Sequence, residues 1–590
     1  MKSILKNKNI FSIIFLLCLI LLLSILKINN YIFLLGSILF HVFLILIIKD
    51  IIRRNSISFS KKEKIFLVIL TTSLIILYSI SIFTRKFIYY WDFSCYYNLQ
   101  LDTIKSYQSG LISGIKQLVG STWAGEYGSL LSYIPQAIFQ FTNKSISFYL
   151  FSSVITIIPY LIISIGIFTK KILNTKKEYK FIISVLIISL IPLLHGTFII
   201  GQPDLFGLVF IFLLLTITKD YNFIKLDIIK LFEILLFTLL LTMSRRWYVY
   251  WILTYYILYI IMILLTNKKE WKIIIKNILL YGIIVLIFYL VPLIPFFKNT
   301  LLNDYASSYQ FYKGGGILEE VVRQIKHLGI IQLIMIFGGI IVGCLRKEHR
   351  KLTIMSFIQL LLIIILFNRI QSMGLHHSLL LIPMYSLFII VLIDFIPKKA
   401  SLVLISIVLL NFIISFTNYT SINFTDVKLI VEDDKNYNQL VKVESFLEKN
   451  LSKNNTAYMI THNNTINPDK LRNIRTPNSK VKKYLPYGSA VIGVHKFPLE
   501  LFTSKYIITT SPYESISVDL KYNNVFKNLV EEKKFKRIKT YQLKDNMKLE
   551  IYERIEKVDE EEKEKYKEAL KEESKEYKYL YEDIINSYKG

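Results

Sequence analysis

Long apolar stretches alternate with short polar ones through the first 418 residues of the chain. A helix needs about 20 consecutive apolar residues to cross the hydrocarbon core of a bilayer. Stretches near this length predict about 13 membrane-spanning helices, at 10–26, 31–48, 65–83, 147–168, 181–194, 205–218, 231–243, 247–265, 273–297, 329–345, 352–367, 378–396 and 400–417. The pattern therefore predicts an α-helical polytopic membrane protein, in which one of the three short stretches between 181 and 243 could be re-entrant.

The loops between these stretches differ in charge, and every second loop is basic. The clearest examples are 49–64, with six Lys and Arg residues, 170–180, with five lysines, and 346–351. Since Lys and Arg collect in cytoplasmic loops, these loops and the N-terminus are expected in the cytoplasm. The other loops, including 84–146 and everything after about 418, then face outward. The pair Arg245-Arg246 is the exception, because it places two cations at an outer end.

Composition agrees with this assignment. The chain is 53% hydrophobic with a mean hydropathy of +0.46, which exceeds what a soluble protein of 590 residues carries. The net charge of +28 comes mostly from the short basic loops, and no basic stripe belongs to a soluble recognition fold. We therefore expect no nucleic-acid partner. Heavy use of Ile, Lys and Asn is typical of AT-rich bacterial genomes, which favours a bacterial plasma membrane.

After residue 418 the apolar runs shorten to strand length, at 457–461, 490–494, 506–509 and 549–552, with helix-like stretches at 437–449 and 524–533. This pattern predicts an extracytoplasmic α/β domain over 419–555, following a transmembrane domain over 1–418. Glu and Lys at helical spacing dominate 556–590, which is expected to be a solvated helix or disordered. The outer loop 84–146 has apolar residues at helical spacing, which predicts amphipathic helices at the interface.

Unusual polar residues gather on the predicted outer side. An acid at a membrane surface is costly unless something uses it. Asp92 stands out because it follows a long apolar run and lies among aromatic residues. The candidates share the outer face and bilayer-edge depth: the acids Asp92, Glu126 and Asp204, the cations Lys86, Arg245, Arg246 and Arg369, the histidines His376 and His377, and the aromatic collar Trp91, Tyr96, Tyr97, Trp247 and Tyr248.

Each candidate also has a structural alternative. Asp204 could cap a helix, and Glu126 could be a solvated loop acid. Arg369 could extend its guanidinium into water from an otherwise apolar position. Their joint occurrence on one face favours a site. A carboxylate can deprotonate a hydroxyl or orient an acceptor, paired arginines bind phosphate through their planar forks, and histidine adds a donor. Together they predict group transfer from a lipid-linked phosphate donor. The chain has no Walker loop, GxGxxG or HExxH, so a soluble nucleotide donor is not expected.

At these residues the chain resembles the GT-C-type membrane glycosyltransferases, which use polyprenyl-phosphate sugars and include protein O-mannosyltransferases and the aminoarabinose transferase of lipid A. The likeness lies in Tyr89-Tyr-Trp-Asp-Phe-Ser-Cys-Tyr-Tyr97, Gly201-Gln-Pro-Asp204, Arg245-Arg-Trp-Tyr248 and His376-His377, and in the order of helices and outer domain. The resemblance implies that Asp92 is the base or acceptor-orienting acid. It also implies that Arg245, Arg246 and His376 hold the lipid phosphate, with Lys86, Arg369 and His377 as further candidates.

One departure concerns metal. Members of the superfamily often have two adjacent acids in the first outer loop, whereas Phe93 follows Asp92 here. Glu126 or Asp204 is then the candidate for the second acid. The resemblance leaves a divalent cation, Mg²⁺ or Mn²⁺, open, because some members use one and others do not.

The leading hypothesis is therefore a glycosyltransferase that moves a sugar from a polyprenyl-phosphate donor in the bilayer to an extracytoplasmic glycan, glycolipid or protein acceptor. A lipid-linked glycan polymerase or ligase would depend more on Arg and His than on an outer-loop acid. A lipid-sugar flippase would favour charges at mid-membrane and inverted halves, neither of which the sequence shows clearly.

Overall fold

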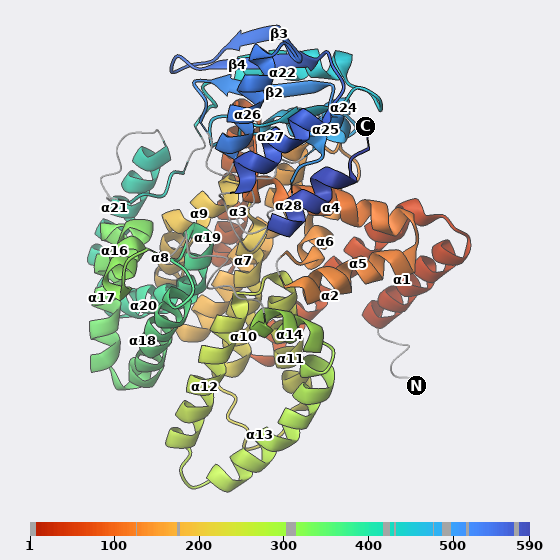
Figure 1. Ribbon diagram of the computed structural model, residues 1–590. Helices are drawn as coiled ribbons and strands as arrows, with labels where there is room; N and C mark the ends of the chain where they lie inside the picture. The colour runs from red at the N-terminus through yellow and green to blue at the C-terminus, as the bar shows by residue number, and fades with distance from the viewer. Residues whose placement is uncertain are drawn as a thin grey trace. The chain divides into compact units, whose positions relative to one another are not determined.

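The computed structural model describes residues 8–125, 127–173, 177–302, 314–416, 425–429, 432–475, 477–486, 497–514, 519–571 and 578–589. The chain divides into two compact units. The helical unit comprises 1–84, 95–142 and 147–431, and the C-terminal unit comprises 85–94, 143–146 and 432–590 (Figure 1). The short segment that carries Asp92 therefore belongs to the C-terminal unit, although it lies more than 300 residues away in sequence.

Eight helical stretches of the described chain are long and apolar enough to cross a membrane. They are η1–α2 (Asn29–Arg54), α3 (Lys61–Thr84), α7 (Ile146–Ile172), α12 (Tyr248–Thr266), α13–η4 (Trp271–Leu290), α18 (Lys347–Asn368), α19–α20 (Leu375–Phe395) and α21 (Lys398–Phe416). Two bent pairs raise the number to ten: α8 (Glu178–Ser189) with α9 (Pro192–Ile199), at 42°, and α16 (Ile317–Leu328) with α17 (Ile330–Leu345), at 109°. The chain is a mostly helical, multi-pass membrane protein.

The predicted number of about 13 spans is not confirmed, since the described residues contain eight helices of sufficient length and apolarity, or ten if each bent pair is one span. The apolar stretches at 205–218 and 231–243 form α10 (Phe206–Thr218) and α11 (Ile228–Ser244), which are 13 and 17 residues long. A helix rises about 1.5 Å per residue, so α10 is too short to span a bilayer. Twelve of its residues are buried, which makes it a core helix of the bundle. Hydropathy cannot separate a short buried helix from a short span, since both are apolar on every side.

The breaks in the bent pairs have local causes. Pro192 begins α9, where its fixed φ suits the first turn and its missing N–H costs nothing. Gly329, between α16 and α17, has φ +87°, a conformation that side chains other than glycine rarely adopt. The predicted helices of the 84–146 loop are α4 (Asp92–Gln108), α5 (Leu111–Ala124), η2 (Ser129–Ser132) and α6 (Tyr133–Phe139).

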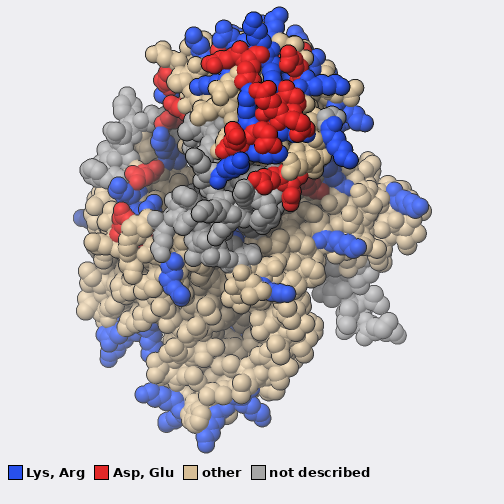
Figure 2. Space-filling model, viewed as in Figure 1, with Lys and Arg blue, Asp and Glu red and all other residues tan. Residues whose placement is uncertain are grey.

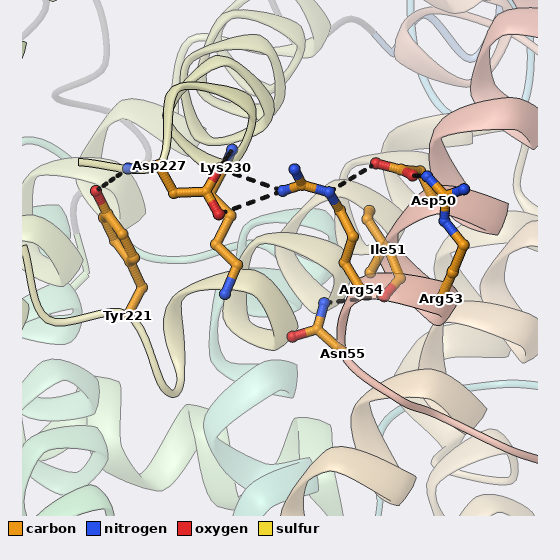
Figure 3. A network of polar contacts seen from close by, with 8 residues as sticks. All are labelled: Asp50, Ile51, Arg53, Arg54, Asn55, Tyr221, Asp227 and Lys230. Carbon is orange, nitrogen blue, oxygen red and sulfur yellow. Dashed lines mark hydrogen bonds and ion pairs between the residues drawn. The ribbon is translucent and has the colours of Figure 1, made fainter. Parts of the chain in front are cut away.

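Basic residues lie at one end of the helical unit. The turn between α12 and α13 carries exposed Lys268 and Lys269, and Figure 2 shows basic side chains at this lower end beneath a wide uncharged surface. Arg54, the last residue of α2 (Ile32–Arg54), precedes another basic loop and links α2 to the N-terminus of α11 (Figure 3). Its Nε lies 3.2 Å from Asp50 Oδ2, and its Nη1 donates to Asp227 Oδ1 at 3.3 Å. Asp227 also accepts from Lys230 N and so caps α11.

The C-terminal unit contains a four-stranded sheet in the order β1-β2-β4-β3 (Figure 1). β1 (Ala457–Met459) is parallel to β2 (Tyr506–Ser511), whereas β4 (Lys548–Arg554) runs antiparallel to β2 and to β3 (Phe535–Gln542). Helix α22 (Tyr437–Asn450) packs Leu440 and Val443 into one core, and α26 (Asp519–Glu531) packs Phe526 and Leu529 into another. The predicted strand 490–494 lies outside the described residues.

Two features differ from the expected pattern. Strand β3 was not predicted, because Lys536, Arg537 and Lys539 make it polar; it is an edge strand, where charge is usual. The tail was expected to be a solvated helix or disordered; its described part is helical and forms α27 (Glu560–Lys571) and α28 (Lys578–Ser587), but α27 is not fully solvated. Tyr566 of α27 is 1% exposed and packs on Phe502.

Candidate functional site

A buried ion pair lies at the centre of the helical unit's candidate site. Asp204 Oδ1 is 3.2 Å from Arg245 Nε, and the two side chains are 0% and 2% exposed. Two charges buried this deeply are stable only when they neutralise each other and their remaining polar atoms find partners. Asp204 lies in η3 (Pro203–Leu205) just before α10, and Arg245 follows α11 directly. The structure thus joins two of the predicted site residues.

Aromatic rings enclose the guanidinium of Arg245. Its central carbon lies 3.8 Å from the centre of the Trp247 ring, 4.1 Å from that of Tyr127 and 5.2 Å from that of Tyr96. Nη1 also donates to the Tyr96 hydroxyl at 2.9 Å. Arg stacks on aromatic faces through cation–π attraction, which strengthens when water is excluded. The predicted aromatic collar therefore forms, in part, a box around Arg245 made of Tyr96, Tyr127 and Trp247, here called the aromatic box.

Burial raises the pKa of Tyr96 well above its ordinary value, although the neighbouring Arg245 works in the opposite direction. The Tyr96 hydroxyl therefore keeps its proton while its oxygen accepts from Arg245. A neutral phenol in this position leaves the charge balance of the pair unchanged.

The backbone around the pair is built to bring these elements close. Arg245 is extended and forms an antiparallel bridge with Tyr127. Tyr248 begins α12 and donates its hydroxyl proton to the Asp204 carbonyl at 2.5 Å. Gly207 makes room for this contact, since a Cβ there would lie 2.2 Å from the Tyr248 ring. Gly128 likewise allows a close approach to Met243, because a Cβ at Gly128 would lie 2.0 Å from the Met243 carbonyl oxygen.

The histidine pair lies beside the same tryptophan. The ring centres of His376 and His377 are 3.9 Å apart, and they lie 5.1 and 4.4 Å from the centre of Trp247. Gln202 Nε2 is 3.3 Å from His376 Nδ1, and the Gly374 N–H donates to His377 Nδ1 at 3.0 Å. Since Nδ1 of His377 accepts, a neutral His377 carries its proton on Nε2. This buried nitrogen has no hydrogen-bond partner among the described residues.

The remaining predicted residues of the helical unit are placed differently. Arg246 is half-buried next to the aromatic box, with its guanidinium carbon 5.8 Å from the centre of the Trp247 ring. Tyr97 is buried against Tyr149 rather than in the aromatic box. Arg369 is exposed at the C-terminal end of α18 and lies outside this cluster. Glu126 lies outside the described residues.

Asp92, Trp91 and Lys86 belong to the C-terminal unit. Asp92 is the first residue of α4 and is exposed, where the partial positive charge of a helix N-terminus stabilises a carboxylate. Trp91 Nε1 donates to His462 Nε2 at 2.6 Å, and its backbone N–H donates to Asp469 Oδ2 at 3.0 Å. Lys86 is exposed, and its backbone N–H donates to Asp433 Oδ1. The predicted residues thus form two sets in two compact units.

The described residues contain no group of three or more His, Cys, Asp or Glu side chains arranged to hold a metal ion. Asp204 is engaged by Arg245, which fits a charge-neutralising partner better than a metal ligand. A site for Mg²⁺ or Mn²⁺ therefore stays a prediction from the resemblance, and no step below passes through one.

Sequence reasoning missed three contributors to these sets. Tyr127 directly follows the candidate acid Glu126, and Gln202 lies inside the motif Gly201–Asp204, so their neighbours were the available signal. His462 follows β1, and a polar residue at the carboxyl end of a parallel strand is a usual place for a functional side chain.

Comparisons with known proteins give fold-level likeness only. Neither the protein-family models nor the curated proteins contain a match. Among solved structures, the crystal structure of ArnT from Cupriavidus metallidurans bound to undecaprenyl phosphate is similar with a TM-score of 0.48 and 9% identity, covering 82% of this chain and 97% of that one. The apo structure of the same ArnT has a TM-score of 0.45 and 10% identity, with the same coverage. The roles proposed below rest on this chain's own residues.

Proposed function

We propose that this chain is a membrane glycosyltransferase that transfers a sugar from a polyprenyl-phosphate donor to an acceptor outside the cytoplasm. The observation that carries the proposal is the cluster around the Asp204–Arg245 pair: a buried ion pair in an aromatic box, with Arg246 beside it and with His377, whose Nε2 has no partner within the described ranges. The cluster lies at the helix ends opposite the basic loops, which is the outer end under the positive-inside rule. Undecaprenyl phosphate, which is bound in one of the two ArnT crystal structures, is a lipid of the proposed class.

The charges of the cluster suit a phosphate. Asp204 already pairs with Arg245, whereas Arg246 is the second arginine of the cluster and is partly accessible. The guanidinium of Arg245 is held by the Asp204 carboxylate and the Tyr96 hydroxyl, and the guanidinium carbon of Arg246 lies 5.8 Å from the centre of the neighbouring Trp247 ring. We therefore assign the phosphate contact to Arg246 first, and a positioning part to Arg245. This refines the sequence hypothesis, in which both arginines bind phosphate.

His377 supplies a second contact. Its Nε2–H is a buried donor that has no acceptor among the described residues, and such donors carry a free-energy cost of about 1–3 kcal/mol. A phosphate oxygen of the donor lipid would satisfy it. As the bond between the anomeric carbon and the phosphate oxygen breaks, negative charge grows on the leaving phosphate, and donors already in place stabilise it.

Asp92 is the proposed acid of the reaction. In the proposed step the acceptor hydroxyl attacks the anomeric carbon, its proton passes to the Asp92 carboxylate, and polyprenyl phosphate leaves with the bonding electrons. An exposed carboxylate at the start of α4 is accessible to an acceptor from solution.

The test is the identity of the lipid product. Purified protein in nanodiscs is given polyprenyl-phosphate hexoses and pentoses together with an acceptor extract from bacterial envelopes, and the lipids are analysed by mass spectrometry. Transfer predicts release of polyprenyl monophosphate. In a parallel assay with pyrophosphate-linked glycans as donors, release of polyprenyl pyrophosphate would instead indicate a polymerase or ligase, and donor that crosses the bilayer uncleaved would indicate a flippase.

Variants locate the phosphate contact. Arg246→Gln should raise the KM for the donor about tenfold or more, because it removes a charged contact of about 1.5–3 kcal/mol. Arg53→Gln is the matched control, since Arg53 is 80% exposed in a basic loop and pairs only with Asp50 of its own helix among the described contacts. Equal donor KM in the two variants would overturn the assignment of Arg246.

A further inference from the structure

The segment 85–94 is built into the C-terminal unit although it comes from the start of the chain. Ile88 is 2% exposed in the same core as Leu440 and Ile466. Asn473 Nδ2 donates to the Tyr89 carbonyl at 2.8 Å, and the Asp434 N–H donates to the Lys86 carbonyl at 2.9 Å. The segment is thus anchored at several successive residues before it reaches Asp92.

Trp91 is the last anchor, and its backbone is unusual. It has φ +47°, a left-handed conformation that costs a residue other than glycine about 1–2 kcal/mol. Such a conformation persists only where neighbouring contacts enforce it. Two contacts do so here: the backbone N–H donates to Asp469 Oδ2 at 3.0 Å, and the indole Nε1–H donates to His462 Nε2 at 2.6 Å.

His462 and Asp469 are well suited to accept these two hydrogen bonds from Trp91. The indole N–H can only donate a hydrogen bond, so His462 Nε2 must accept it and carries no proton. Burial lowers the pKa of His462 to about 4, which keeps the ring neutral at physiological pH. Both partners lie on ordered elements: His462 follows β1, and Asp469 belongs to α23 (Pro468–Arg472), whose first turn is capped by Asn467.

Asp92 follows Trp91 directly and depends on it. The Ser94 N–H and Ser94 Oγ both donate to the Trp91 carbonyl, at 2.9 and 3.1 Å, and the Phe93 N–H donates to the Tyr90 carbonyl. These bonds form the first turn of α4, which begins at Asp92. A shift of Trp91 therefore moves the Asp92 carboxylate with it.

We propose that His462 and Asp469 are positioning residues for Asp92, so that the C-terminal unit sets the geometry of the acid used in transfer. This inference rests on the proposed function for its catalytic part, and on the segment's contacts for its structural part. It also gives the C-terminal unit a role in the proposed reaction.

The kinetic test compares variants that keep the shape but remove the contact. His462→Phe keeps a ring but cannot accept, and Trp91→Phe keeps a ring but cannot donate. Each should lower kcat on the order of tenfold with donor KM within about twofold, since a displacement of about 1 Å can cost up to a hundredfold. The double variant should be no worse than either single one, because both remove the same bond. Additive losses would overturn the assignment.

Arg537→Gln on the exposed edge strand β3 is the matched control, as it breaks an ion pair of the same unit with Glu550. It should leave kcat unchanged. An equal loss of kcat in this control would overturn the proposal, since it would show a general sensitivity of the C-terminal unit.

A second measurement does not need activity. Hydrogen–deuterium exchange over 85–94 should become faster in His462→Phe and Asp469→Leu and stay unchanged in Arg537→Gln. Unchanged exchange in the first two variants would overturn the anchoring itself. If the two variants exchange faster but the wild type transfers no sugar, the anchoring is supported and only the proposed reaction is refuted.

Discussion

At the scale of single residues, the Asp204–Arg245 pair decides what this site can be. Both side chains are almost completely buried, so each charge is stable only while the other is present. Arg246 lies near this pair and is partly exposed, with its guanidinium carbon 5.8 Å from the centre of the Trp247 ring. A buried neutral pair in an aromatic box, beside a second and partly exposed arginine, suits the proposed binding of a lipid phosphate.

Removing one member of the pair should therefore be worse than removing both. Asp204→Asn should lower the free energy of unfolding by about 3–5 kcal/mol, because it leaves a buried guanidinium without its counter-charge. Thermal unfolding in detergent measures the loss. The double variant Asp204→Leu with Arg245→Met should recover part of the stability while binding no donor. A double variant less stable than Asp204→Asn would contradict the pairing.

His462 predicts a pH dependence of stability. Its pKa is lowered to about 4 in the folded chain, against about 6.5 when unfolded, so the unfolded state binds a proton first as the pH falls. The stabilising contribution is complete above pH 6.5 and is lost between pH 6.5 and 4. Between pH 7 and 5 the wild type should lose about 2 kcal/mol that His462→Gln does not lose. Parallel pH profiles of the two proteins would contradict the assignment.

At the scale of elements, close packing between helices places the side chains of the cluster. Gly207 in α10 lets the Tyr248 ring approach, and Tyr248 in turn fixes the Asp204 carbonyl. The sequence indicated most residues of this cluster, including Tyr96 and Trp247 of the aromatic box, but not Tyr127 or the way in which the rings enclose Arg245. The reason is physical: Arg245, Tyr96 and Tyr127 meet through tertiary packing, which hydropathy and loop charge do not encode. The predicted count of spans is not confirmed for the related reason that buried α10 is as apolar as a span.

Gly207→Ala tests this packing. A Cβ at Gly207 would lie 2.2 Å from the Tyr248 ring, so the ring must move and its bond to Asp204 weakens. Stability should fall by about 1–3 kcal/mol, with a loss of transfer activity. Gly120→Ala is the matched control, because a Cβ at Gly120 in α5 meets nothing within 4 Å. That control should be neutral or up to about 1 kcal/mol more stable, and equal effects of the two changes would refute the role of Gly207.

At the scale of the whole molecule, sequence alone predicted the main architecture, a polytopic helical part followed by a small α/β part. It predicted α22 and most of α26 and missed β3, whose charged residues suit a sheet edge. It could not predict that 85–94 joins the C-terminal unit, because such a contact leaves no local pattern in the chain. The separation of the candidate residues into two sets is therefore a result of the structure alone.

The orientation in the membrane can be tested with single cysteines in a background without Cys18, Cys95 and Cys344. Lys268→Cys, in the basic turn after α12, should react with an impermeant maleimide only after the cytoplasmic side is opened. Lys548→Cys, exposed on β4, should react in intact cells. Labelling of both from the same side would contradict the predicted topology.

The central claim is most directly tested by the rate of sugar transfer from a polyprenyl-phosphate donor in wild type, Asp92→Asn and Asp102→Asn. Asp102 is a suitable control because it is an exposed acid of the same helix, with its side chain 62% exposed. We predict that Asp92→Asn lowers kcat about 100-fold or more, as expected for the loss of a general base, while Asp102→Asn remains within about twofold of wild type. Full transfer activity in correctly folded Asp92→Asn protein would contradict the account.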